Sequence, residues 1–345
     1  MHNQICNPLR GQRIFSNPSR FLGTVTGGLL LVLLSSNGQL TMAEANVPTS
    51  DGDRVETLTP PPPTIEGVQI APITVIDVGH EPRQVLQLKP SVDTAQQSVM
   101  TLDMAGTMTA SGMTQPLPNT PTTKMVLETD VTQIDETGHR YIDFEYTEVE
   151  VDDAPDFPPE ALEAMRSQLS QLEGLAGSWV INEQGYLSQF TMTSPDTMPA
   201  VLGQSLQQMV DSLQHMSAPF PTEAIGVGAQ WQMPYSASMN GITMNGIATY
   251  ELTSVEGDRV ILQAAIDQQG TATNLSDVEL PETVDLGVQQ LNSSGQGVIE
   301  MDLNAVMPVY SDMSLTSISS FLVGHQGIEV PVSMNMVINM SLVSE

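Results

Sequence analysis

The chain is poor in cysteine, aromatic residues and basic residues. It has one Cys among 345 residues, and aromatic side chains make up only 4%. That single residue, Cys6, precedes the apolar run near the start of the chain, whereas a lipid anchor needs a cysteine directly after such a run. If this N-terminal segment is a leader that is removed, the remaining chain has no disulfide bond and no thiolate chemistry.

Basic residues are outnumbered fourfold by acidic ones. Ten Lys and Arg stand against 40 Asp and Glu, which gives a formal net charge of −30. A surface this acidic repels phosphate groups. We therefore expect no nucleic-acid partner and no docking on anionic lipid headgroups.

The leader contains no apolar run long enough to span a bilayer, which takes roughly 20 residues. The run from Phe21 through Leu34 is shorter, follows Arg10, Arg13 and Arg20, and is followed by Ala43-Glu44-Ala45. This order is typical of a secretory signal with an Ala-x-Ala cleavage site. We predict a signal peptide over residues 1–45 and an extracytoplasmic location, periplasmic or secreted. Whether the signal is cleaved or retained as an anchor stays open.

Catalytic motifs are missing as well. The sequence contains no Gly-x-Ser-x-Gly elbow, no Gly-rich phosphate loop and no His-Glu-x-x-His zinc motif. The histidines after the leader fall in the predicted tether (His80), at turns (His139, His325) and near a helix end (His215). We expect a non-enzymatic protein without a cofactor.

What the chain does have is methionine at alternating positions. Its 21 Met outnumber its 7 Phe, and in the final segment the apolar residues at every second position from Val330 to Leu342 include three Met. Period two predicts a strand with one apolar face. Methionine makes that face soft and adaptable, so it suits either a core or a binding surface.

Prolines mark the start of the folded part. Pro60 to Pro63 are four consecutive prolines, which form an extended spacer. We predict a Pro-rich disordered tether over 46–80 and a single antiparallel β-rich domain over 81–345.

Within this domain, period-two segments dominate and are joined by short turns such as Asp135-Glu136-Thr137-Gly138. Two segments, near 159–176 and 199–217, have helical period instead. We therefore predict an α+β fold: a large curved antiparallel sheet, a half-barrel of about a dozen strands, with two helices packed on one face.

Three short segments, together with the Met-rich alternating strands before them, carry a resemblance to a family that spans most of residues 83–345. Gly226-Val227-Gly228-Ala229-Gln230-Trp231 follows a proline stop at Pro219, and Tyr250-Glu251-Leu252 precedes Glu256-Gly257-Asp258-Arg259-Val260. On its own, the first segment is a Gly-rich turn that lets Trp231 enter the core. Together these segments resemble a family of uncharacterised exported bacterial proteins. The resemblance implies a fold similar to periplasmic lipoprotein carriers, and it implies no catalytic residues.

These observations favour a binding module that holds a lipid or other apolar ligand in a concave, Met-lined face. A structural or envelope-associated interaction domain with a filled core is the alternative. The sequence leaves the ligand's identity, protein partners and the oligomeric state open. The predicted ligand-binding residues are Met104, Met108, Met165, Met209, Met216, Met334, Met336 and Met340.

Metal binding is a further alternative, and we assign no metal ligands. Methionine thioethers suit copper(I), but the strand Met have no His or Cys companions. The acidic stretch from Glu145 to Glu160 suits calcium, but it lacks the Asp-x-Asp-x-Asp-Gly spacing of a calcium loop.

Overall fold

The chain divides into two units, Met1–Met42 and Ala43–Glu345, and all the residues described below belong to the second. The computed structural model describes residues 64–66, 72–155, 157–193, 219–239, 242–272, 284–325 and 328–345. Nearly all of the regular structure in these ranges is β. The strands are β1 (Thr64–Glu66), β2 (Thr74–Asp77), β3 (Ala95–Ala110), β4 (Met113–Pro116), β5 (Thr123–Ile134), β6 (Arg140–Val151), β7 (Ala176–Ile181), β8 (Leu187–Thr193), β9 (Gln230–Met239), β10 (Ile242–Glu256), β11 (Arg259–Ala272), β12 (Val284–Asp302), β13 (Tyr310–His325) and β14 (Ile328–Ser344).

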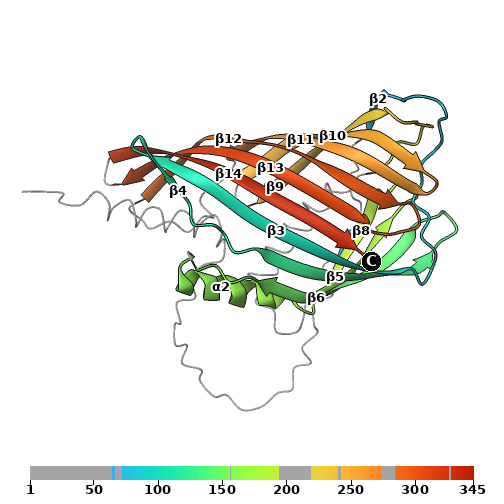
Figure 1. Ribbon diagram of the computed structural model, residues 1–345, viewed down its shortest axis with the longest axis horizontal. Coiled ribbons are helices and arrows are strands. Elements are labelled where there is room, and N and C mark those ends of the chain that lie inside the picture. The colour runs from blue at the N-terminus through green and yellow to red at the C-terminus, as the bar shows by residue number, and fades with distance from the viewer. Residues whose placement is uncertain are drawn as a thin grey trace, which may run out of the picture. The chain divides into compact units, whose positions relative to one another are not determined.

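The described strands form one antiparallel sheet. Its order is β1-β8-β7-β6-β5-β3-β14-β13-β12-β11-β10-β9-β2, with β4 paired to β3 beside this path. Most neighbours are also consecutive along the chain, as short hairpin turns predict. The longest of the long-range exceptions is β14, which pairs with β3 along most of its length, so that the red and cyan strands lie side by side in Figure 1.

Strands from opposite ends of this order share one core. Phe144 of β6 and Phe190 of β8 belong to the same cluster of buried side chains as Trp231 of β9 and Tyr250 of β10. The sheet therefore folds back so that these strands face one another. The ring of Phe144 stacks 5.0 Å from Trp179, and that of Trp231 stacks 5.7 Å from Tyr250. Both tryptophans of the chain thus lie where the sheet folds back.

Two connecting segments hold the folded-back parts together. The Leu88 amide donates to the carbonyl of Glu183, and the Phe220 amide to that of Gln184, both in the β7–β8 turn. Fully buried Trp231 donates its indole N–H to the Pro219 carbonyl at 3.1 Å. The predicted entry of Trp231 into the core after the Gly-rich turn is confirmed.

The predicted α+β class, with two helices on one face, is wrong. The described residues hold one α-helix, α2 (Pro159–Leu169), continued by a 3-10 turn η1 (Ser170–Leu172). This helix contributes no buried residue, and its main packing partner is β6. The second predicted helix, 199–217, lies outside the described residues. Among the helices that the structure describes, none is both long and apolar enough to cross a membrane.

The first helix also ends earlier than predicted. Gly174 adopts a positive φ of 75°, which a helix does not continue through, and Leu175 turns into the core. Ala176 then begins β7, opposite Glu145 of β6. The apolar residues after Leu169 fit the helical spacing but lie in the 3-10 turn, the loop and a strand.

The predicted tether over 46–80 is too long. Residues Thr64–Glu66 and Thr74–Asp77 form β1 and β2, which pair with β8 and β9. Ile73 and Val75 pack against the main core. This apolar alternation is typical of a strand, and the strand forms although prolines precede it. The folded part therefore begins before Glu81.

Candidate functional site

The face of β3 and β9–β14 that continues from the core is called the inner face here. Trp231 and Tyr250 are opposite each other in the register, and the same row of cross-strand partners crosses β11 and β12 to Met313 of β13 and Met340 of β14. Directly opposite residues point to the same side of a sheet. The Met-rich face of β14 is therefore continuous with the aromatic core.

The predicted apolar face of β14 is confirmed by burial. Met334 is buried, and Met336, Ile338 and Met340 are half-buried, whereas Asn335, between them, is exposed. Met334 pairs with the equally buried Met108 of β3. Ile338 pairs with half-buried Met104.

Five of the predicted site residues therefore share this face: Met104, Met108, Met334, Met336 and Met340. Met165 does not join them, because it lies on α2, whose main partner is β6. Met209 and Met216 lie outside the described residues. Five of the eight predicted residues are thus brought together on two neighbouring strands.

A row of polar side chains crosses the same face. Tyr235 of β9, Gln268 of β11, Ser293 of β12 and Ser317 of β13 follow one line of cross-strand partners, which continues to Met336 of β14. We call these four the polar row. The hydroxyl of Tyr235 donates to Gln268 Oε1 at 2.8 Å, and that of Ser293 to Ser317 Oγ at 3.0 Å. These partners let polar groups lie on a largely apolar face.

A glycine makes the first of these bonds possible. Tyr235 lies on β9 and Gln268 on β11, so the tyrosine ring must cross the intervening β10. It crosses at Gly246, where an added Cβ would lie 2.5 Å from the ring carbon that carries the hydroxyl. Burial and then the charge of Asp267 raise the pKa of Tyr235 to about 12. The phenol therefore stays neutral and keeps its proton to donate.

Sequence reasoning missed the polar row. Gln268, Ser293 and Ser317 occupy alternate positions within apolar patterns, where they look like interruptions. They meet only through the register of β11, β12 and β13. Glycines at inner positions, such as Gly246 and Gly295, were the available signal, because glycine inside a strand often marks a close approach.

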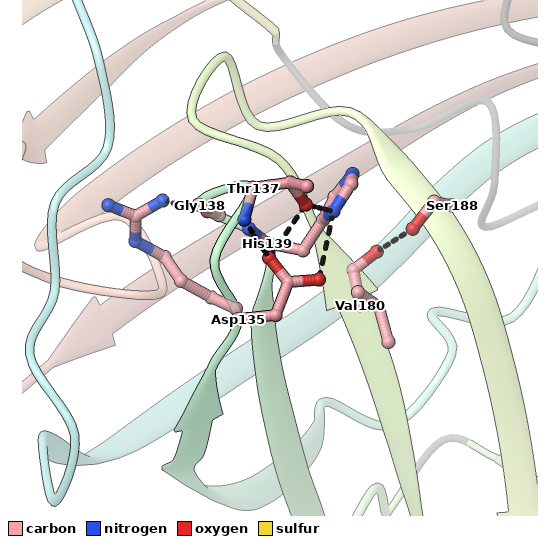
Figure 2. A network of polar contacts seen from close by, with 7 residues as sticks. Asp135, Thr137, Gly138, His139, Val180 and Ser188 are labelled. Atoms are coloured by element: carbon pink, nitrogen blue, oxygen red, sulfur yellow. Dashed lines mark hydrogen bonds and ion pairs between the residues drawn. The ribbon is translucent and has the colours of Figure 1, made fainter.

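Figure 2 shows a second polar network, at the turn between β5 and β6. Asp135 Oδ1 accepts hydrogen bonds from the Thr137 hydroxyl at 2.7 Å, the Thr137 amide at 2.8 Å and the His139 amide at 2.9 Å. These bonds, the Thr137 hydroxyl first, lower the pKa of Asp135 to about 2. Such side-chain bonds to nearby backbone are typical of an Asx turn.

This network does not have the arrangement of a catalytic triad. The His139 Nδ1 atom lies 2.6 Å from Thr137 Oγ1 and 3.3 Å from Asp135 Oδ2. A relay needs the carboxylate on one ring nitrogen and the nucleophile on the other. Here both partners meet the same nitrogen, so the group stabilises the turn.

Arg140 ties the same turn to the β7–β8 turn. It is buried, donates from Nη1 to the Gly138 carbonyl at 2.6 Å, and has an Nε atom with no hydrogen-bond partner among the described residues. Burial lowers its pKa, while the charge of Glu183 acts in the opposite direction. Glu183 in turn accepts from Gln87 at 2.6 Å. This is a structural link between two hairpins.

Within the described residues, no three His, Cys, Asp or Glu side chains gather as metal ligands would. Two carboxylates of the acidic stretch after Glu145 instead form separate ion pairs. Glu150 pairs with Lys124 at 3.4 Å, and Asp153 with Arg166 at 2.6 Å.

Comparisons with known proteins identify no relatives by sequence. No protein-family model matches the chain, and no curated protein matches it. The predicted resemblance to exported proteins with a carrier-like fold therefore stays a prediction.

Solved structures that align with the chain do so at low scores. A mutant porin of Rh. blastica aligns with TM-score 0.20 and 8% identity, covering 71% of this chain and 99% of that chain. OccK11 (OpdR) of Pseudomonas aeruginosa aligns with TM-score 0.20 and 5% identity, covering 76% and 100%. The outer membrane protein OmpT of Vibrio cholerae aligns with TM-score 0.16 and 9% identity, covering 76% and 100%. Scores this low establish no shared fold.

Proposed function

We propose that this is an exported, extracytoplasmic protein that binds a lipid or another apolar ligand on the inner face of its sheet and catalyses no reaction. The observation that carries the proposal is the inner face of β3, β13 and β14. There Met104, Leu315, Met336, Ile338 and Met340 point inward but remain partly exposed. The buried aromatic residues of the core, such as Trp231 of β9 and Tyr250 of β10, lie on other strands.

The outer side of the same strands provides the contrast. Along β14 it carries Ser333, Asn335 and Asn339, which are exposed. Asn339 accepts a hydrogen bond from Ser314 at 2.8 Å and donates to Asp103 at 3.1 Å, which makes a polar row across β13, β14 and β3. The outer side therefore mixes polar side chains with exposed aliphatic ones such as Ile318 and Val337, whereas the inner side of these strands is mainly apolar.

Methionine favours binding over rigid packing on this face. Its unbranched thioether adapts to ligands of different shape, and it is common on promiscuous binding surfaces. A ligand that covered Met336, Ile338 and Met340 would remove their remaining exposed area from water, which is favourable by roughly 25 cal/mol per Å². A non-catalytic role agrees with the His139 network, whose geometry stabilises a turn.

A matched pair of substitutions on β14 tests the proposal. Ile338→Thr places a hydroxyl on the inner face, and Val337→Thr makes a similar change on the outer face, where Val337 is 37% exposed. We expect Ile338→Thr to weaken binding of N-phenyl-1-naphthylamine, a neutral apolar fluorescent probe, about tenfold, because one altered apolar contact is worth about 1–3 kcal/mol. Val337→Thr should bind as the unmodified protein does.

Native mass spectrometry of protein purified from its own cell envelope gives an independent readout. We expect an apolar molecule to co-purify with it. A bare polypeptide mass, together with no binding of the fluorescent probe, would contradict the proposal and favour the interaction domain with a filled core. Thermal unfolding of both variants controls for loss of the fold.

A further inference from the structure

The inner face alternates in chemistry from row to row. On one side of the polar row, Leu315, Ile338 and Met104 form an apolar row of cross-strand partners. On the other side, Met334 pairs with Met108. A molecule that covers both kinds of row needs an apolar chain and a group that forms hydrogen bonds.

The polar row has groups that can bind such a head. Gln268 accepts from Tyr235 through Oε1, and its amide N–H groups donate to no side chain that the structure describes. The Ser317 hydroxyl accepts from Ser293 and has a proton of its own to donate. The head-group partners offered by this row are neutral hydroxyl and amide groups.

No Asp, Glu, Lys or Arg occupies an inner-face position of β3 and β9–β14 among the side chains that the structure describes. Aspartates on these strands, such as Asp103 and Asp267, take the alternate positions and face outward. The described basic residues lie elsewhere and have acidic neighbours. These neighbours are Glu81 for Arg83, Asp258 for Lys89, Glu150 for Lys124, Glu183 for Arg140, Asp153 and Glu163 for Arg166, and Glu300 for Arg259.

A charged head group would therefore find no counter-charge on this face. Taking an ion out of water without a partner is costly. The tyrosines indicate the same environment. Burial, and to a smaller extent the charge of Asp267, raises the pKa of Tyr235 to about 12. Burial, and to a smaller extent Tyr235, raises the pKa of Tyr250. Both shifts disfavour negative charge on this face.

We propose that the ligand is a single-chain amphiphile with an uncharged, hydrogen-bonding head group, such as a monoacylglycerol, and that its head lies on the polar row. This inference rests on the proposed function. The acyl chain lies along the row of Leu315, Ile338 and Met104.

Three probes with the same chain length and different head charge test the inference: monolauroylglycerol, laurate and dodecyltrimethylammonium. Each displaces N-phenyl-1-naphthylamine from the purified protein below its critical micelle concentration. We expect monolauroylglycerol to bind at least about tenfold more tightly than either ion, a difference of about 1.4 kcal/mol. Equal or tighter binding of laurate or the ammonium would overturn the inference and leave the proposed function standing. Failure of the fluorescent probe and all three amphiphiles to bind would overturn both.

Adjacent glutamines provide the matched variants. Gln268→Leu removes the amide from the polar row, and Gln269→Leu makes the same change at the next, exposed position of β11. We expect Gln268→Leu to weaken monolauroylglycerol binding about fivefold to tenfold, and Gln269→Leu to leave it unchanged. Equal effects of the two substitutions would contradict a head-group site on the polar row. Ser293→Ala is a second inner-face variant if Gln268→Leu does not fold.

Discussion

At the scale of single residues, glycine on the inner face decides which side chains reach one another. Gly246 leaves the space in which Tyr235 crosses β10 to reach Gln268. Gly295 and Gly297 lie in similar positions beside Leu315 and Met313, and Gly106 beside Met336. Larger side chains lie over these glycines, so small and large residues fit together across neighbouring strands.

Gly246→Ala should therefore destabilise the protein by about 1–3 kcal/mol, because a new methyl group overpacks a filled position. The Cβ would meet the Tyr235 ring, which would move away from Gln268. Urea unfolding of the variant measures the free energy change. Gly287→Ala is the control, since its Cβ would meet nothing closer than 3.8 Å.

We expect the control to unfold like the unmodified protein or at slightly higher urea, because alanine in a strand is favoured over glycine by roughly 0.5–1 kcal/mol. Equal destabilisation by both substitutions would contradict the role of Gly246 in leaving space for the Tyr235 ring.

At the scale of elements, the turn between β5 and β6 depends on one ionised carboxylate. The hydrogen bonds to Asp135, first from the Thr137 hydroxyl, lower its pKa from 3.8 to about 2. A lowered folded-state pKa means that ionisation stabilises the fold above the unfolded-state value, and that this stability is lost as the pH falls through the folded-state value. The relevant window is therefore between about pH 4 and pH 2.

Asp135→Asn keeps an oxygen acceptor and removes the charge. We expect the variant to melt at a lower temperature than the unmodified protein above pH 4, and the difference to shrink as the pH falls toward 2. Thermal melts at several pH values, followed by circular dichroism, measure it. Asp143→Asn, an exposed position on β6, is the control. A melting difference that stays constant from pH 6 to pH 2 would mean that the charge of Asp135 is not what the turn uses.

Elements also show how far the sequence could predict the fold. The period-two pattern of β14 and the antiparallel hairpin order follow from local patterns, because alternation and short turns are properties of neighbouring residues. The helical spacing up to Ala176 was misleading. The positive φ of Gly174 ends the helical segment, and the pairing of β7 with β6 makes Ala176 part of a strand. Because four prolines come before β1, the sequence analysis did not predict β2, the strand that contains Val75.

The candidate site was predictable only in part. The Met of β14 and β3 fall on one face because alternation along each strand places them there. Their pairing joins Met108 to Met334, which lie 226 positions apart in the chain, and no local signal carries that register. The polar row depends on the register of five strands at once. Long-range pairing, and not strand formation, is the step that sequence patterns left undetermined.

At the scale of the whole molecule, charge is the dominant feature. The net charge of −30 creates self-repulsion, which opposes the compact state. The described ion pairs are at least partly exposed: Lys89 and Asp258, for example, retain 51% and 48% of their side-chain surface. Exposed pairs contribute about 0–1 kcal/mol each, so they offset little of the repulsion.

Added salt should therefore stabilise this protein. Sodium chloride shortens the screening length from roughly 30 Å at 0.01 M to about 3 Å at 1 M, which weakens long-range repulsion more than contacts between neighbouring charges. We expect the melting temperature to rise between 0.01 M and 0.5 M NaCl, by about 2–4 °C for each kcal/mol of repulsion relieved. Lys89→Met, which removes one cation and leaves Asp258 unpaired, should depend on salt more steeply. A melting temperature that falls as salt is added would mean that the ion pairs contribute more to stability than the repulsion removes.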